Sequence, residues 1–418
     1  MEKIIIQGGE KLRGTVRISG SKNAALPILI STLLTDGKCV IKNVPDLADI
    51  NTTVQLLQYI GKQVDVRGDT VFVSARKKLK NTAPYELVRK MRASVLVMGP
   101  LIARLNKVKV SLPGGCAIGA RPIDIHLDGF AKLGAKINLQ GGYVEMQCNK
   151  LAGGHIKFRF PSVGATENLL LAAALTEGKT VLDNAACEPE ITDLIDVLNK
   201  MGAKITGLSG GKKLIIEGVG HLGGFVHSVI PDRIETATYM IAAAITKGDI
   251  TLENTDCGII QIIADKLKDC GMRVSSDKGT INARWAGRLK PINIKTGVYP
   301  AFPTDVQAQW MALMATLKGR SVIEETVFEN RFIHAVELQR LGADIKISGR
   351  KVVINGVENL SGAPVMVSDL RAGAALVLAG LAAKGKTEVL RIYHLDRGYE
   401  HMEKKLRKLG AKIQRVSI

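Results

Sequence analysis

The chain has 418 residues, of which 46% are hydrophobic and only 4% are aromatic. This length predicts two domains rather than one, and the hydrophobic content excludes global disorder. The formal net charge of +19 predicts anionic partners. Because the basic residues are dispersed and aromatic stacking platforms are few, we expect no nucleic-acid partner, and a small polyanionic substrate fits better.

Neither a membrane anchor nor a metal centre is expected. No apolar run reaches the roughly 18–20 residues that a membrane span needs, and the first residues lack a signal-peptide pattern, so a cytoplasmic protein without membrane insertion is predicted. The cysteines form no CxxC pair and have no histidine at metal-ligand spacing, which predicts no disulfide framework, no metal and no cofactor. These cysteines are Cys39, Cys116, Cys148, Cys187, Cys257 and Cys270.

A glycine that ends an amphipathic helical run recurs six times along the chain. Successive glycines are 73, 68, 69, 71 and 68 residues apart, and each precedes a short alternating strand. A second helix–glycine–strand signal, such as TEGKTVLDN at 176–184, lies within most repeats. This alternation predicts an α/β protein in which six repeats form two domains of three. The glycines are Gly61, Gly134, Gly202, Gly271, Gly342 and Gly410.

The first helix of each repeat begins with polar or charged residues. N-capping is the simple interpretation for Ser162, Thr304 and Ser368. Capping does not explain the cations, because positive charge is unfavourable at a helix start. We therefore expect a bound anion near these starts. The cations are Lys22, Arg92, Arg233 and Arg371.

The segment 113–124, PGGCAIGARPID, has three glycines and two prolines and cannot form a regular element. It predicts a long loop of the kind that often acts as a lid. A loop cysteine is more often inert than catalytic, but Arg121 lies five residues after Cys116 and would lower the pKa of the thiol.

PGGCAIGARPIDIH at 113–126 resembles the active-site loop of the UDP-N-acetylglucosamine 1-carboxyvinyltransferases, a family of the EPSP synthase superfamily. Further segments that resemble this family occur in order over the whole chain. They are SGSKNAALP at 19–27, VRKMRAS at 88–94, PSVGAT at 161–166, PDRIETAT at 231–238, YPAFPTDVQAQ at 299–309, ETVFENRFIH at 325–334, SDLRAGAALVLAG at 368–380 and RIYHLDRGYEHMEKKLRKLGA at 391–411.

The resemblance implies a fold of two inside-out α/β barrel domains, each of three repeats, with helices inside and sheets outside. One domain would comprise 22–229 and carry the Cys116 loop. The other would comprise 1–21 and 230–418 and carry Asp305 and Arg397. It further implies an active site in the cleft between the domains, and we expect a monomer.

The implied reaction transfers the enolpyruvyl group of phosphoenolpyruvate to the 3′-hydroxyl of UDP-N-acetylglucosamine by addition and elimination, with release of phosphate. In the family this is the first committed step of peptidoglycan precursor synthesis, on which bacterial cell-wall biogenesis, shape and division depend. By resemblance Asp305 is the base. Cys116 is the acid, can form a covalent adduct, and is alkylated by the antibiotic fosfomycin. Lys22, Arg121 and Arg397 match the family's phosphoenolpyruvate clamp.

The resemblance also assigns residues to the nucleotide sugar and to domain closure. Arg331, Asp369 and Arg371 match residues that line the cleft and couple closure, with Asp49 as a weaker member. The chain departs from the family at Phe160, where a lysine is common, although Arg159 is adjacent. His126 is interpreted as structural rather than catalytic. Matches to the sugar site are Asn23, Arg92, Arg121, Pro122, Ile123, Asp124, Ile125, Ser162, Val163, Gly164, Asp305 and Val327.

Three other functions fit the sequence less well. The sister enzyme that acts on shikimate 3-phosphate shares the chemistry but lacks the cysteine loop. A repeat protein that binds nucleic acid would need more aromatic residues. A paralogue that binds without catalysis conflicts with the expected residue at every catalytic position.

Overall fold

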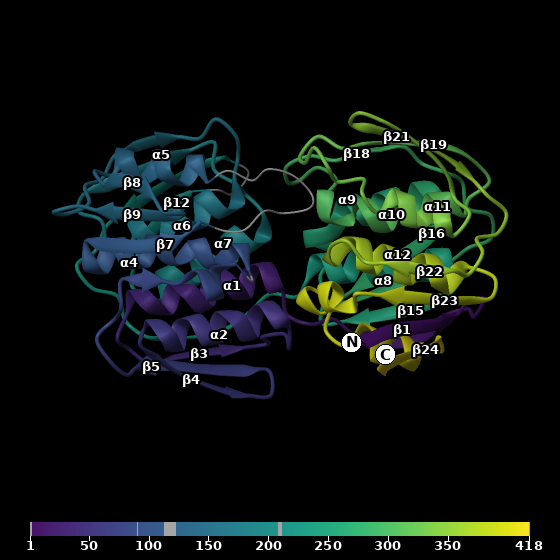
Figure 1. Ribbon diagram of the computed structural model, residues 1–418, viewed down its shortest axis with the longest axis horizontal. Coiled ribbons are helices and arrows are strands. Elements are labelled where there is room, and N and C mark those ends of the chain that lie inside the picture. Colours follow the sequence, from purple (N-terminus) through teal and green to yellow (C-terminus); the bar gives the residue numbers. More distant parts are fainter. Residues whose placement is uncertain (1, 90, 113–122, 208–210, 418) are drawn as a thin grey trace. The chain divides into compact units, whose positions relative to one another are not determined.

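The computed structural model describes residues 2–89, 91–112, 123–207 and 211–417. The chain forms two compact units. The described residues of unit 1 are 2–19 and 231–417, and those of unit 2 lie between 20 and 230. Figure 1 shows helices and strands alternating in both units.

The strands of unit 2 form three four-stranded sheets in the described part of the chain. Within each sheet, one edge strand pairs in parallel with its neighbour, and the other two pairings are antiparallel. In two of these sheets a buried inner helix lies in the connection between the parallel strands, whereas in the third sheet these strands, 39–42 and 225–228, come from the two ends of the unit. The strand orders are β14 (Phe225–Ser228), β3 (Cys39–Lys42), β5 (Thr70–Ala75), β4 (Lys62–Arg67); β6 (Thr82–Ala83), β7 (Lys107–Ser111), β9 (Tyr143–Gln147), β8 (Lys136–Gln140); and β10 (His155–Lys157), β11 (Lys179–Asp183), β13 (Lys213–Glu217), β12 (Lys204–Gly207).

The helices of unit 2 fall into an inner and an outer set. The inner helices are rich in apolar residues and buried over most of their surface, as in VGATENLLLAA, where every residue from Ala165 to Ala173 is buried. The longer outer helices are amphipathic and end at the repeat glycines Gly61, Gly134 and Gly202. The inner set is α1 (Lys22–Ser31), η1 (Thr32–Leu34), η2 (Arg92–Val97), α4 (Met98–Leu105) and α6 (Val163–Ala173), and the outer set is α2 (Ala48–Ile60), α3 (Tyr85–Val88), α5 (Asp124–Lys132) and α7 (Pro189–Lys200).

Unit 1 repeats this plan, and strands from the beginning of the chain complete two of its sheets. Ile5 in β1 lies opposite Glu388, and Thr15 in β2 lies opposite Thr251. Residues 2–19 therefore belong to the same unit as residues 231–417. The strand orders are β16 (Met272–Asp277), β17 (Thr280–Trp285), β15 (Asp249–Glu253), β2 (Arg13–Arg17); β18 (Ile294–Lys295), β19 (Gly319–Glu324), β21 (Lys351–Gly356), β20 (Asp344–Ser348); and β22 (Pro364–Met366), β23 (Lys386–Leu390), β1 (Glu2–Gln7), β24 (Lys412–Ser417).

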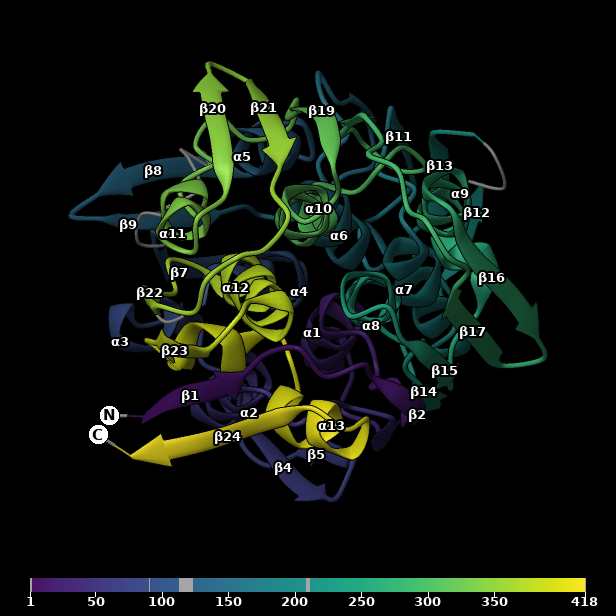
Figure 2. The same ribbon diagram turned by 90° about the vertical axis from the view of Figure 1, so that its right-hand side faces the viewer.

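Three buried helices of unit 1, α8, α10 and α12, contact one another. Figure 2 looks along them, with the strands of the same unit around the outside. The described sheets of a unit are separate, and no closed sheet forms. The inner helices are α8 (Arg233–Ile245), η4 (Thr304–Val306), α10 (Gln307–Ala315) and α12 (Leu370–Ala382), and the outer helices are η3 (Cys257–Ile260), α9 (Gln261–Cys270), α11 (Ala335–Arg340), η5 (Ile392–Arg397) and α13 (Met402–Lys408).

The prediction that six glycines end the outer helices is confirmed. Each has a positive φ, between 90° and 128°, which glycine adopts without the cost that a side chain brings. The capping prediction is confirmed for Ser162, whose Oγ accepts from Ala165 N (3.3 Å). It is wrong for Thr304 and Ser368. The hydroxyl of Thr304 donates to Glu325 (2.8 Å), and the cap of α12 is Asp369.

An asparagine that ends a strand holds the backbone that leads into an inner helix. Asn43, Asn184 and Asn254 have φ between 56° and 57°. Their Nδ2 atoms donate to carbonyl oxygens of Val229 (2.8 Å), Phe158 (3.0 Å) and Ile18 (2.8 Å), respectively. Each acceptor lies just before the start of a buried helix or before the segment where the chain changes unit. These asparagines thus hold the backbone just before the starts of α8, α6 and α1.

The described residues lack two features of other classes of protein. None of the helices there is long and apolar enough to cross a membrane. Within the same residues, no three side chains from His, Cys, Asp and Glu gather as they would to hold a metal ion.

Candidate active site

The inner helices of unit 1 begin with three aspartates that behave differently. Asp232 caps α8 by accepting from Ile234 N (2.7 Å) and Glu235 N (2.9 Å). Asp369 caps α12 by accepting from the amides of residues 371 and 372 (3.0 and 3.1 Å). Asp305 lies in η4, and its carboxylate instead faces arginine side chains. Of these three aspartates, Asp305 is therefore the one whose carboxylate does not cap a helix.

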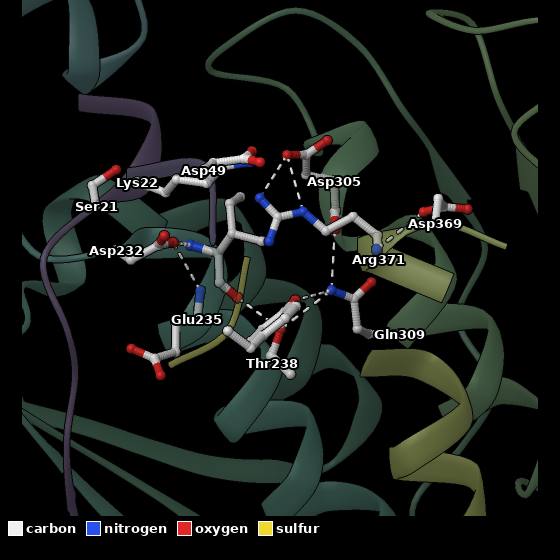
Figure 3. Close-up of polar contacts among 12 residues, drawn as sticks. Ser21, Lys22, Asp49, Asp232, Glu235, Thr238, Asp305, Gln309, Asp369 and Arg371 are labelled. Atoms are coloured by element: carbon white, nitrogen blue, oxygen red, sulfur yellow. Dashed lines mark hydrogen bonds and ion pairs between the residues drawn. The ribbon is translucent and has the colours of Figure 1, made fainter. Parts of the chain in front are cut away.

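Two buried arginines hold the Asp305 carboxylate. Arg331 Nη2 lies 3.0 Å from Oδ1, and Arg371 donates to Oδ2 from Nη2 (2.8 Å) and Nε (3.2 Å). Figure 3 shows the guanidinium group of Arg371 directed at this carboxylate. The arginine side chains are 4% and 3% exposed, whereas that of Asp305 is 29% exposed. Asp305 is accordingly an ionised, partly accessible carboxylate at the edge of a buried cationic pair.

A buried hydrogen-bond network supports this pair from below. Burial alone would lower the pKa of Arg371, but Asp305, Tyr399 and Asp232 together outweigh burial and raise that pKa above its usual value. The guanidinium carbon of Arg371 lies 5.5 Å from the centre of the Tyr399 ring. Gln309 Nε2 donates to Tyr399 Oη (2.9 Å), Thr238 Oγ1 (3.2 Å) and the Asp305 carbonyl (3.1 Å). Helices α8, α10 and α12 are thereby joined beneath the candidate base (Figure 3).

Asp369 and His334 interact electrostatically with Arg331 and with each other. Burial alone would raise the pKa of Asp369, but the Arg331 charge and two backbone N–H groups outweigh it and lower that pKa. His334 is buried, and chiefly for that reason its pKa falls to about 4. At neutral pH Asp369 is therefore a carboxylate and His334 a neutral imidazole.

The other predicted residues of unit 1 lie on short irregular segments. Val327 N donates to Glu325 Oε1 (2.8 Å), and the same buried carboxylate accepts from Thr304 Oγ1 (2.8 Å). Glu325 thus links the segment carrying Val327 to the start of η4. Arg397 is the half-buried last residue of η5, and together with burial it lowers the pKa of His394.

In unit 2, Lys22 forms a buried ion pair. It is the first residue of α1, and its Nζ lies 3.2 Å from Asp49 Oδ2, with side-chain exposures of 9% and 4%. Asn23 follows it in the first turn. A buried lysine at a helix start is unfavourable unless an anion compensates it, and Asp49 supplies part of that compensation.

A second group in unit 2 surrounds His126. Burial, and then the charge of Arg92, lowers the pKa of His126 to about 4. Asn168 Nδ2 donates to His126 Nδ1 (3.1 Å). A Cβ placed on Gly164 would lie 3.2 Å from the imidazole carbon Cε1, so the start of α6 packs closely on this ring. The arrangement brings Arg92, His126 and the Ser162–Gly164 segment together, with His126 as a neutral packed side chain.

The departure from the family at position 160 has a structural counterpart. Arg159 forms an ion pair with Asp124, and Phe160 is 43% exposed. Ile123 is buried and Ile125 is partly buried beside Asp124 in α5. Arg159, the cation next to Phe160, thus pairs with Asp124, which is one of the predicted sugar-binding residues.

Cys116, Arg121 and Pro122 lie outside the described residues. The sequence interpretation missed Gln309 and Glu325. Gln309 stands four residues after Asp305, a spacing that brings side chains onto one face of a helix. Glu325 stands inside the matching segment ETVFENRFIH.

A comparison with protein families agrees with this geometry. The family model described as EPSP synthase (3-phosphoshikimate 1-carboxyvinyltransferase) matches residues 6–406. The chain belongs to the EPSP synthase family.

Similar members of the EPSP synthase family match the chain from end to end. A UDP-N-acetylglucosamine 1-carboxyvinyltransferase of Endomicrobium trichonymphae is 62% identical over 99% of both chains. A protein of the same name from Desulfosudis oleivorans is 56% identical over 100% of both. The crystal structure of the enolpyruvyl transferase NikO from Streptomyces tendae aligns with a TM-score of 0.90 at 26% identity, covering 100% of this chain and 99% of NikO. EPSP synthase from Acinetobacter baumannii aligns with a TM-score of 0.76 at 19% identity over 100% of both chains, a likeness of fold.

Proposed function

We propose that this chain is a transferase that moves the enolpyruvyl group of phosphoenolpyruvate to the 3′-hydroxyl of UDP-N-acetylglucosamine and releases phosphate. The observation that carries the proposal is the 62% identity, over 99% of both chains, to a UDP-N-acetylglucosamine 1-carboxyvinyltransferase. The product begins peptidoglycan precursor synthesis. The substrates are two small anions, which agrees with the formal net charge of +19.

The reaction has two steps, an addition and an elimination. In the addition, the sugar oxygen bonds to C2 of phosphoenolpyruvate, the hydroxyl proton passes to a base, and C3 gains a proton from an acid. In the elimination, C3 loses a proton, the C2–phosphate bond breaks, and the double bond returns. The site therefore has to supply a base, an acid and cations for a carboxylate and a phosphate.

Asp305 is the proposed base. Its partial exposure gives a substrate access, and the Arg331 and Arg371 charges favour the ionised form that can take a proton. A carboxylate is a weak base for an alcohol, so the proton moves late, when the new C–O bond has formed. Movement of either arginine would change the basicity of Asp305, which couples the chemistry to closure through Arg331, Asp369 and Arg371.

Cys116 is the proposed acid for C3. An ordinary thiol is mostly protonated near pH 7, with a pKa of about 8.5. Arg121 favours the thiolate, which can add to phosphoenolpyruvate and form a covalent adduct. The same nucleophilicity predicts alkylation by fosfomycin. Lys22, Arg121 and Arg397 are the proposed clamp for phosphoenolpyruvate, in which arginine binds by its fork and lysine as a point charge.

The proposal assigns the nucleotide sugar to residues at helix starts, where free N–H groups and cations favour an anion. It requires both units to contribute residues to one reaction. We further propose that the units correspond to the domains 22–229 and 1–21 with 230–418, that each is an inside-out α/β barrel, and that the enzyme is a cytoplasmic monomer. The proposed sugar-binding residues are Asn23, Arg92, Arg121, Pro122, Ile123, Asp124, Ile125, Ser162, Val163, Gly164, Asp305 and Val327.

Phosphate release from phosphoenolpyruvate tests the function. The acceptors are UDP-N-acetylglucosamine and shikimate 3-phosphate, because the description of the matching family model names the latter reaction. We expect release with the nucleotide sugar alone and its loss after treatment with fosfomycin. Release with shikimate 3-phosphate alone would establish the sister activity, and release with neither acceptor would refute the proposed reaction.

A further inference from the structure

A cavity on unit 1 lies apart from every residue of the proposed active site. Its volume is about 770 Å³, and its lining comes from the sheet β16-β17-β15-β2 and from turns beside β15 and β17. Ile250 and Ile281 of these strands are buried against the helices, whereas Asp249 and Arg284 are on the opposite face. The cavity therefore opens on the outer face of the sheet. Its basic lining residues are Lys11, Arg13, Lys247, Arg273 and Arg284.

Strand register brings three of the arginines into one row. Arg13 lies opposite Asp249, Asp249 opposite Arg284, and Arg284 opposite Arg273. Side chains directly opposite on neighbouring strands point to the same face, and like charges in that relation are destabilising. The fold thus keeps Arg284 and Arg273 adjacent although their charges repel. An anion bound between them would relieve that repulsion.

The single carboxylate of the lining cannot neutralise this charge. Asp249 accepts from Asn282 Nδ2 (2.9 Å) and lies 3.6 Å from Arg284 Nε. Five basic side chains less one carboxylate leave a net charge of +4 at neutral pH. The next row across the sheet contains Thr15, Thr251 and Asn282 and carries no charge. The positive charge is consequently compact and does not form a stripe along the face.

An aromatic side chain adds to one wall. Trp285 is partly buried at the end of β17, and Lys11 Nζ lies 5.9 Å from the centre of its ring. An indole ring beside a cluster of cations offers a stacking surface next to a phosphate-binding surface.

We infer that this cavity binds a small polyphosphate, either inorganic or the polyphosphate group of a nucleotide. Its volume lies within the range of about 300–1,000 Å³ of small-molecule sites. Arginine forks bind phosphate oxygens in pairs, and a net charge of +4 complements the roughly four negative charges of a triphosphate. An extended nucleic acid would require a longer basic surface. The inference is independent of the proposed reaction.

The test is a titration of the full-length chain with inorganic tripolyphosphate and with ATP at low salt. Saturating UDP-N-acetylglucosamine is present so that the proposed sugar site is occupied, and the arginine variants below separate binding in the cavity from binding at the proposed phosphoenolpyruvate clamp. The chain has two tryptophans, and Trp310 is fully buried, so a fluorescence change on binding reports Trp285. Isothermal calorimetry gives the affinity independently of fluorescence.

Arg273→Ala combined with Arg284→Ala is expected to weaken tripolyphosphate binding at least about tenfold, because charge-assisted contacts are lost. The matched control, Lys204→Ala with Lys213→Ala, removes two exposed strand cations from unit 2 and is expected to keep the affinity within about twofold. Trp285→Phe should abolish the fluorescence change while calorimetry still detects tripolyphosphate. Phosphate release from phosphoenolpyruvate should be the same in all these variants.

A nucleotide ligand is indicated if ATP binds more tightly than tripolyphosphate and loses that advantage in Trp285→Leu, which removes the aromatic ring. Equal affinities indicate recognition of phosphate alone, and both results support the inference. Three results would overturn it: no binding of either ligand, unchanged binding in the double arginine variant, or an affinity for single-stranded oligonucleotides that exceeds that for tripolyphosphate and rises with length.

Discussion

Asp305→Asn tests the geometry at the centre of the candidate site. Asparagine has nearly the shape of aspartate but cannot take the hydroxyl proton. Loss of a general base reduces turnover by about 10²–10⁴-fold, equivalent to about 3–5 kcal/mol of activation free energy. We expect kcat for phosphate release with UDP-N-acetylglucosamine to fall within this range.

The same substitution should lower stability, because Arg331 and Arg371 stay buried without their carboxylate. Removing one member of a buried ion pair costs about 3–5 kcal/mol. Asp305 is 29% exposed, and the asparagine carbonyl can still accept from one arginine, so about 1–3 kcal/mol is expected. For a unit of this size that corresponds to a decrease in Tm of roughly 3–10 °C.

Thermal unfolding and phosphate release on the same samples check both expectations. Asp269→Asn is the control, since Asp269 is 56% exposed in unit 1 and pairs with Lys266 at 3.3 Å. It should leave Tm and activity unchanged. Full activity in Asp305→Asn, or a Tm equal to that of the control, would contradict the assigned role of this carboxylate.

Three further results are expected. Cys116→Ser should lose most phosphate release and resist fosfomycin labelling, measured by mass spectrometry; full activity would refute its role as acid. The pKa of His126 is about 4 in the folded chain, against an ordinary value of 6.5. The stability that neutral His126 gives the fold is therefore fully present above pH 6.5, and about 3 kcal/mol of it is lost as the pH falls towards 4. His126→Gln should therefore flatten the fall in Tm between pH 7 and 5, and an unchanged slope would count against this origin. Gly202→Ala, at φ 103°, should cost about 1 kcal/mol in urea unfolding, whereas Gly220→Ala, also in open space but without a positive φ, should cost little; equal costs would exclude backbone strain as the cause.

Local features of the fold could be predicted from the sequence because their causes act over a few residues. A glycine after an amphipathic run predicts a left-handed residue at a helix end, and Gly61 and Gly410 have φ of 128° and 98°. The run GAALVLAGLAA predicts a helix buried on every face, and α12 is such a helix. Capping by a particular hydroxyl could not be predicted in this way, because a hydroxyl near a helix start has other hydrogen-bond partners. The hydroxyl of Thr304 donates to Glu325 instead.

Residue types at the candidate site could be assigned by resemblance, but their contacts could not. Asp305 and Arg371 are 66 residues apart and meet because α10 and α12 pack together. Gln309 becomes a support for Asp305 only because Tyr399 and Thr238 reach the same space from other segments. No short-range preference encodes such a meeting, since burial of three apolar helices against one another decides it.

The sequence by itself determined the six-fold repeat, the helix ends, the absence of long apolar runs and the residues that match the family, since each depends on identity or on short spacing. Only the tertiary structure decided which strands pair and which charges become neighbours. β1 lies between β23 and β24 from the other end of the chain. In another sheet, the row of Arg13, Asp249, Arg284 and Arg273 exists only because β15 pairs with β2 and β17, and β17 pairs with β16. The physical reason is that register between distant strands is selected by burial of their apolar faces, which then places the charged side chains of the other face side by side.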